Sequence, residues 1–254
     1  MTVSKSIITT SAMAFALMFG GGVYVLTQLN TLAKPVVEKI ATQALGVRVS
    51  ISVMDISLKE KRVDVGGIRI ANPDGFSKPY ALTVGNVQVG LRSVSEGLID
   101  FENIDVRGAD VFLEVKTDTT NLHTLKSGMK GAQDAPSDKE PVKVIVRRFT
   151  LEEAQVNPSV TLLAEQDLNS VKVAPVRLNG IGVKENGILA REAVTQIMAP
   201  LLETFSQAAG DAGLYQGMSP DALREMGVGQ VEILKDQILK EVDDIGAGIK
   251  KLFD

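Results

Sequence analysis

The chain has 254 residues, no cysteine and a formal net charge of −4. The absence of cysteine excludes disulfide bonds and thiolate metal sites, and the acidic balance excludes a general nucleic-acid binder, because phosphate contacts need clustered Lys and Arg. Hydrophobic residues make up 44% of the chain and aromatic ones only 4%, so the core must be built from Val, Ile and Leu, which favour strands. We therefore expect a mainly β protein with additional α-helices.

Residues 1–30 are predicted to form an N-terminal transmembrane helix that acts as a single-span anchor. The apolar part, Ile7 to Leu26, would cover about 30 Å as a helix, which is enough to cross a hydrocarbon core. A buried soluble helix and a cleaved signal peptide are the alternatives, but no typical cleavage site follows the apolar run. The flanking Lys and Arg residues do not favour a cytoplasmic N-terminus, so charge alone leaves the orientation open.

Residues 31–46 are predicted to form a short connector helix between the membrane and the body of the protein. Pro35 lies near its first turn and Gly46 just past its end, which are the preferred positions of these two residues. Its apolar residues recur at helical spacing, so one side could pack on the following domain.

Residues 47–182 are predicted to form a curled antiparallel β-sheet. The apolar positions change parity within single strands: Leu82 and Val84 precede Gly85-Asn86, whereas Val87 and Val89 follow it. Similar slips are predicted at Met54-Asp55, Gly66-Gly67, Glu102-Asn103 and Arg147-Arg148.

A β-bulge at each slip would return the apolar residues to one side and bend the strand. Repeated in successive strands, such bulges would curl the sheet into a half-pipe, or groove, with an apolar concave face. The alternative is a sandwich in which each long strand is really two short ones.

The rest of the chain is predicted to be a mobile polar loop near 127–141 and a helical region over 183–254. The helical region contains a helix kinked by Pro200 and a final amphipathic helix over about 229–253. The final helix would pack on the sheet or on a partner helix.

Motifs for catalysis and metal binding are absent from the sequence. His123 is the only histidine, so a transition-metal site would need carboxylate ligands alone. Glu152 and Glu153 are neighbours in a predicted strand and would point to opposite faces. The segment Asn72 to Gly75 is typical of a turn and lacks the spaced acids of a calcium loop. We predict no enzyme activity, no catalytic residue, no metal and no cofactor.

Several short motifs follow one another in a fixed order: "NPDGF" from Asn72, "GADVFLE" from Gly108, "NLHTL" from Asn121 and "LNGIGVKENG" from Leu178. In this order they resemble the short members of the AsmA-like family of Gram-negative envelope proteins, relatives of the bridge-like lipid-transfer proteins. The resemblance covers roughly Thr31 to Leu202. It implies a β-groove that faces the periplasm on a single-pass inner-membrane anchor, with a role in envelope lipid homeostasis or outer-membrane biogenesis.

The expected ligand is therefore a phospholipid or another acyl lipid, bound on the apolar face of the groove. The candidate lining residues lie on the majority parity of their strands: Val49, Ile51, Leu82, Val84, Val111, Leu113, Val144 and Val146. These residues could instead be the closed core of a sandwich, since apolar strand faces are usually core. A second hypothesis is an anchored scaffold that binds a protein partner, or a second copy of itself, through the final helix.

Overall fold

The computed structural model describes residues 26–95, 97–116, 119–132, 142–161, 165–167 and 169–214. The first 25 residues of the predicted anchor and the helices predicted beyond residue 214 lie outside this part of the chain. Among the described residues, none of the helices combines the length and the hydropathy needed to cross a bilayer.

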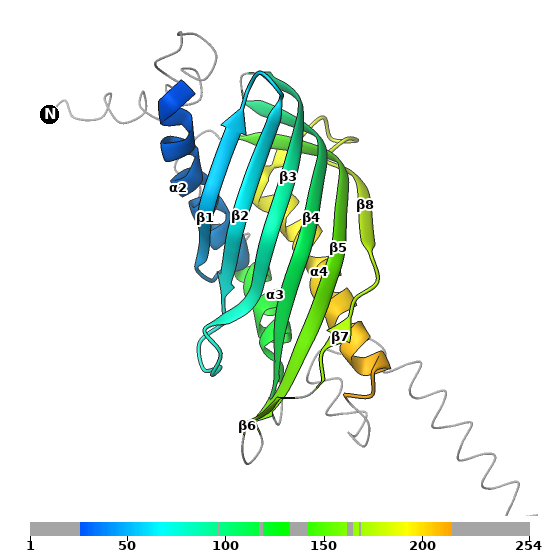
Figure 1. The fold of residues 1–254 in the computed structure, drawn as a ribbon. Coiled ribbons are helices and arrows are strands. Elements are labelled where there is room, and N and C mark those ends of the chain that lie inside the picture. The colour runs from blue at the N-terminus through cyan, green and yellow to red at the C-terminus, as the bar shows by residue number, and fades with distance from the viewer. Residues whose placement is uncertain are drawn as a thin grey trace, which may run out of the picture.

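The described chain is mainly β, as predicted, with three helices (Figure 1). The five principal strands are β1 (Val49–Ser57), β2 (Arg62–Ala71), β3 (Tyr80–Ser95), β4 (Leu98–Val115) and β5 (Lys143–Thr161). Four short strands all pair with β5: β6 (Glu165–Asp167), β7 (Val171–Lys172), β8 (Val176–Ile181) and β9 (Ile188–Leu189). The helices are α2 (Leu26–Leu45), α3 (Asn121–Ala132) and α4 (Ala190–Asp211). The predicted connector helix is thus the C-terminal part of α2.

The sheet is mixed, so the prediction of a purely antiparallel sheet is wrong at one pair of strands. Strands β1 to β4 pair antiparallel in chain order, whereas β4 and β5 are parallel from Leu98↔Lys143 to Val115↔Val160. The segment between these two strands contains α3 and is long enough to return the chain to the starting end of β4, as a parallel pair requires. Because α3 continues to Ala132, the loop predicted to begin at residue 127 is helical in its first part.

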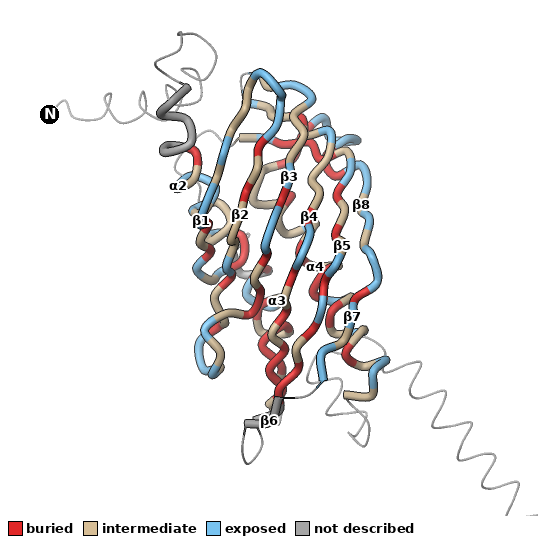
Figure 2. The backbone as a smooth tube through the Cα atoms, viewed as in Figure 1, coloured by how far each residue is buried: buried red, intermediate tan, exposed pale blue. Residues whose placement is uncertain are grey.

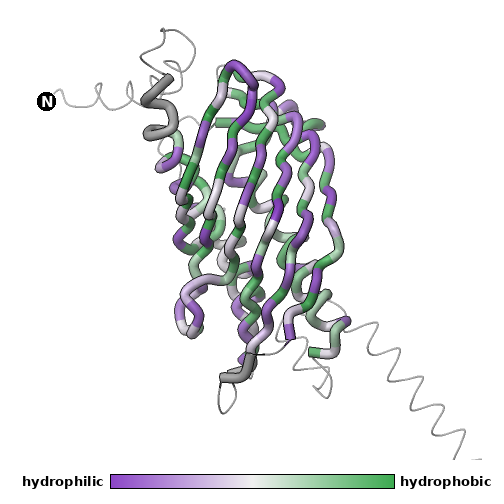
Figure 3. Tube along the Cα trace, in the orientation of Figure 1, coloured by the Kyte–Doolittle hydropathy of each residue, from purple (hydrophilic) through white to green (hydrophobic). Residues whose placement is uncertain are grey.

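All three helices lie against the same face of the sheet (Figure 1), which we call the inner face. The buried residues of this face form one core cluster with buried residues of α3 and α4. Along each strand, buried residues alternate with exposed ones (Figure 2), and apolar residues alternate with polar ones (Figure 3). The opposite, outer face of the sheet carries the polar side chains, as expected for a sheet covered on one side.

The slips in parity are real, but most are not bulges. Leu82, Val84, Val87 and Val89 all belong to the core cluster or pack against it, so the prediction that they share one face is confirmed. Across this slip the register of β3 with its neighbour β4 does not shift, because Val84↔Ala109 and Asn86↔Arg107 belong to one continuous register.

Each of the five principal strands has a slip at one level of the sheet. The registers on both sides place Ser52, Gly67, Gly85, Gly108 and Glu153 in one line across the sheet, which we call the reversal row. Three of these residues have a positive φ: 62° at Gly67, 68° at Gly108 and 56° at Glu153. Since every strand gains an extra residue at this level, inward residues change parity together there and pairing is preserved. The slips predicted at Glu102-Asn103 and Arg147-Arg148 are second slips of β4 and β5, and at the first of them the register of β4 with β3 shifts, as at a bulge.

Two predictions near this row are wrong in detail. The slip in β1 occurs at Ser52-Val53 rather than at Met54-Asp55. Val53 therefore does not face the core and is 63% exposed. In β5, the buried residues on either side of Glu152 and Glu153 are Leu151 and Ala154. The two glutamates therefore both lie on the outer face rather than on opposite faces, because the positive φ of Glu153 interrupts the alternation.

Candidate functional site

The structure brings all eight predicted groove residues together on the inner face. Each of them is at most 8% exposed and belongs to the core cluster: Val49, Ile51, Leu82, Val84, Val111, Leu113, Val144 and Val146. The same cluster contains Leu122 of α3 and Leu201 and Phe205 of α4. In this structure the eight side chains therefore pack against the protein's own helices.

Burial differs between the two ends of the inner face. At the end that carries residues 72–79, which we call the loop end, packing is complete: Leu113, Val115, Leu122 and Leu125 are at most 1% exposed. At the other end lie the turns of the β1–β2 and β3–β4 hairpins, and we call it the hairpin end. There the inner-face residues of β1, β3 and β4 are only half-buried: Met54, Ile56, Val89, Leu91, Ile99, Phe101 and Ile104. We call this set the hairpin-end apolar residues.

None of the hairpin-end apolar residues was among the eight sequence candidates. Their alternation was visible in the sequence, but the candidates were chosen from the majority parity of each strand. A strand that reverses its parity presents inward residues of both parities, so half of its inner face is lost by this choice. The better signal was the slip itself, since apolar residues on both of its sides face inward.

Helix α2 covers the free edge of β1 and runs antiparallel to it. The backbone amides of Ile51 and Val49 donate to Glu38 Oε1 at 2.7 Å and to Thr42 Oγ1 at 3.0 Å. Lys34 Nζ donates to the carbonyl oxygen of Ser52 at 3.3 Å. These bonds satisfy backbone groups that an edge strand would otherwise present to another chain. They also place the N-terminus of α2 at the hairpin end.

The loop end is closed by a buried carboxylate that the sequence did not reveal. Glu114 is 1% exposed and accepts hydrogen bonds from the backbone amides of Ser77 and Lys78, both at 2.8 Å, from the Ser77 hydroxyl at 2.7 Å and from the Asn72 side chain. These bonds satisfy the carboxylate oxygens, whose burial would otherwise be costly.

Asn121, at the start of α3, completes this polar cluster. Its side-chain amide donates to Asn72 Oδ1 and to the carbonyl oxygen of Phe112, both at 2.7 Å, and its Oδ1 accepts from the backbone amide of Glu114 at 2.9 Å. Three of the short motifs of the sequence thus meet in space through Asn72, Glu114 and Asn121. Their observed role is to hold residues 72–79 and the start of α3 against the end of β4.

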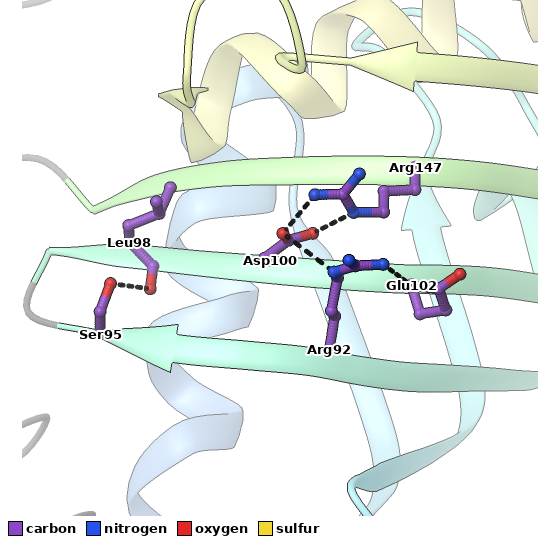
Figure 4. Close-up of polar contacts among 6 residues, drawn as sticks. All are labelled: Arg92, Ser95, Leu98, Asp100, Glu102 and Arg147. Atoms are coloured by element: carbon purple, nitrogen blue, oxygen red, sulfur yellow. Dashed lines mark hydrogen bonds and ion pairs between the residues drawn. The ribbon is translucent and has the colours of Figure 1, made fainter.

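A second polar cluster lies on the outer face near the hairpin end (Figure 4). Asp100 accepts from Arg147 Nε at 3.0 Å and from Nη2 at 2.8 Å, and Arg92 lies 4.0 Å from the same carboxylate while pairing with Glu102 at 3.1 Å. The hydrogen bond to Asp100 raises the pKa of the Arg147 guanidinium, against the opposing effect of burial. All four side chains are engaged in pairing across strands.

The chemistry available in the described residues is limited. No group of three or more His, Asp or Glu side chains in this part of the chain could hold a metal ion. His123 is half-buried in the first turn of α3, where its backbone amide donates to Thr120 Oγ1 at 3.1 Å. Comparisons with protein-family models, with curated proteins and with solved structures found no match.

Proposed function

We propose that this protein is a membrane-anchored, non-enzymatic lipid-binding protein whose sheet accommodates acyl chains on its inner face. The observation that carries the proposal is the uneven packing of that face. The hairpin-end apolar residues are half-buried, whereas Leu113, Val115, Leu122 and Leu125 at the loop end are at most 1% exposed.

An acyl chain would therefore enter from the hairpin end and lie between the sheet and the helices. Burial of apolar surface favours such an insertion by about 0.8 kcal/mol per CH₂ group. The half-pipe predicted from the sequence would take its opened form with a lipid in place, because α3 and α4 otherwise pack on the inner face. Entry of an acyl chain would therefore require α3 and α4 to move away from the inner face.

The resemblance to AsmA-like proteins suggests where such binding would serve the cell. We propose that the body faces the periplasm from a single-pass anchor in the inner membrane. The protein would contribute to envelope lipid homeostasis or outer-membrane biogenesis by holding a phospholipid or another acyl lipid.

The test is to purify the full-length chain in a mild detergent and to identify bound lipid by mass spectrometry. Two variants of neighbouring residues in β3 form a matched pair: Val89→Glu places a charge on the half-buried inner face, and Gln88→Glu places one on the exposed outer face. We expect phospholipid with the wild type and with Gln88→Glu, and a loss of at least several-fold with Val89→Glu. Wild-type protein free of phospholipid, or equal lipid in both variants, would overturn the proposal.

A further inference from the structure

We propose that the hairpin end of the sheet rests on the surface of the bilayer that carries the anchor, with the β1–β2 turn, residues 58–61, in contact with anionic phospholipid headgroups. This inference deepens the proposed function, because it names the surface from which an acyl chain would reach the inner face. It depends on the geometry of α2, on the charge of the turn and on the difference in burial between the two ends of the inner face.

The geometry of α2 places its first residue at the hairpin end. Lys34 lies beside Ser52, and eight residues of helix place Leu26 about 12 Å beyond this contact. The five strand residues after Ser52 carry β1 about 17 Å in the same direction. The predicted span ends at Leu26, so the polypeptide leaves the bilayer at nearly the level that the hairpin reaches.

The charge of the hairpin suits an anionic surface. Lys59 and Lys61 are exposed, while Glu60 is paired with Arg62 at 3.1 Å, and Arg62 also pairs with Asp64 at 2.7 Å. Glu60, Arg62 and Asp64 together carry a net charge of −1, so the two lysines leave residues 59–64 with a net charge of +1. Basic side chains next to a membrane anchor are attracted by anionic lipids within a Debye length.

Other features of the two ends agree with this orientation. The turn at residues 182–187, also at the hairpin end, contributes one lysine and one glutamate, so it does not oppose the charge of residues 58–61. The hairpin-end apolar residues lie on the strands that end there. At the far end, the Glu114 cluster holds residues 72–79 closed over the core. An apolar ligand therefore meets the hairpin-end apolar residues, which are half-buried, on the side that we place against the membrane.

The absence of cysteine allows a direct test with single labels on the full-length chain. Glu60→Cys labels the hairpin end and Asp74→Cys labels the loop end; both positions are exposed and both changes remove one negative charge. Each variant carries an environment-sensitive fluorophore in nanodiscs of phosphatidylcholine and phosphatidylglycerol that contain a headgroup spin-labelled lipid. We expect quenching at residue 60 to exceed that at residue 74 by at least threefold, and equal or reversed quenching would overturn the orientation.

The role of charge is tested in the Glu60→Cys background. Lys59→Glu with Lys61→Glu should reduce quenching at residue 60 at least twofold in discs with phosphatidylglycerol and leave it unchanged in discs of phosphatidylcholine alone. The matched pair Lys172→Glu with Arg177→Glu, which lies away from the hairpin end, should leave quenching unchanged. Equal effects of the two pairs would overturn the contact with anionic headgroups.

The same preparations separate this inference from the proposed function. Phospholipid that copurifies with the protein, together with equal quenching of the two labels, would overturn the orientation and retain lipid binding. Unequal quenching without copurified phospholipid would retain the orientation and overturn lipid binding.

Discussion

The side-chain amide of Asn121 donates to the side-chain oxygen of Asn72 over 2.7 Å, although 49 residues separate them in the chain. This bond joins the start of α3 to residues 72–79, and Glu114 binds the same loop from the end of β4. Three motifs that were only turn, strand and helix signals in the sequence thus form one buried polar cluster. The cluster closes the inner face at the loop end and leaves the hairpin end as its less tightly packed side.

Glu114→Ala should destabilise the protein strongly. The substitution removes the acceptor of two part-buried backbone amides, of the Ser77 hydroxyl and of one hydrogen bond of the Asn72 side chain, and donors left unpaired in this way are costly. We expect a loss of about 3 kcal/mol in the free energy of unfolding, measured by urea denaturation of the full-length protein in detergent. Glu185→Ala, an exposed glutamate in the turn at residues 182–187, serves as the control and should change stability by less than about 0.5 kcal/mol. Equal effects of the two substitutions would contradict the role assigned to the cluster.

Substitutions in the reversal row should change stability according to φ. Gly108→Ala should lower the free energy of unfolding by about 1–2 kcal/mol, because φ is +68° at this position. No clash adds to this cost, since no atom lies within 4 Å of the added methyl group. Gly67→Ala should cost more, since its methyl group would also meet Ser52 Oγ at 2.6 Å. Glu153→Asn should instead stabilise by roughly 0.5 kcal/mol, because Asn tolerates the left-handed conformation better than Glu. Thermal unfolding of the three variants should give the highest midpoint for Glu153→Asn and the lowest for Gly67→Ala. A Glu153→Asn variant less stable than the wild type would contradict the prediction.

The backbone amides at the edge of β1 should exchange faster with solvent when the two side chains of α2 that accept their hydrogen bonds are removed. Glu38→Ala with Thr42→Val deprives the amides of Ile51 and Val49 of their acceptors. Each lost bond corresponds to about 1–2 kcal/mol, so we expect these two amides to exchange roughly tenfold faster in hydrogen-exchange mass spectrometry. Lys39→Ala, an exposed residue of the same helix, should leave the exchange unchanged. Unaltered exchange in the double variant would show that α2 does not protect this edge.

The Arg147–Asp100 pair should contribute no pH dependence from the arginine over the accessible range. Its raised pKa means that the stabilising effect is present in full below the unfolded-state pKa and is lost only as the pH rises through the folded-state pKa. Both pKa values lie above the accessible pH range. Arg147→Lys, which cannot form the two-pronged contact, should lower the urea midpoint by the same amount at pH 6 and pH 9. A difference that shrinks between these pH values would contradict this assignment.

The sequence predicted which residues lie on the inner face better than it predicted how the strands pair to form that face. Parity slips placed Leu82 and Val89 on one face correctly, because burial of apolar residues determines which side of a strand faces inward. The same slips were interpreted as independent bulges, since a single sequence shows each strand alone and not that Gly67 and Gly108 lie at one level. The parallel pairing of β4 with β5 was missed for a related reason: the alternation of a strand does not tell the direction of its neighbour.

The Glu114 cluster could not be predicted because its partners are distant in the chain. A glutamate at the end of an apolar strand is usually solvated, and only the fold shows that the amides of Ser77 and Lys78 converge on it. Likewise, the eight candidate groove residues were correctly assigned to one face, but their packing under α3 and α4 depends on helix positions that hydrophobic periodicity does not provide.

Photo-crosslinking from the inner face tests lipid binding most directly. A benzoylphenylalanine at Phe101 replaces one aromatic side chain by another among the hairpin-end apolar residues, and the same residue at Gln88 reports on the exposed outer face. After irradiation of cells and purification of the full-length chain, intact-mass spectrometry should show an adduct of phospholipid mass at position 101 and none at position 88. No adduct at position 101, or equal adducts at both positions, would contradict the binding of acyl chains on the inner face.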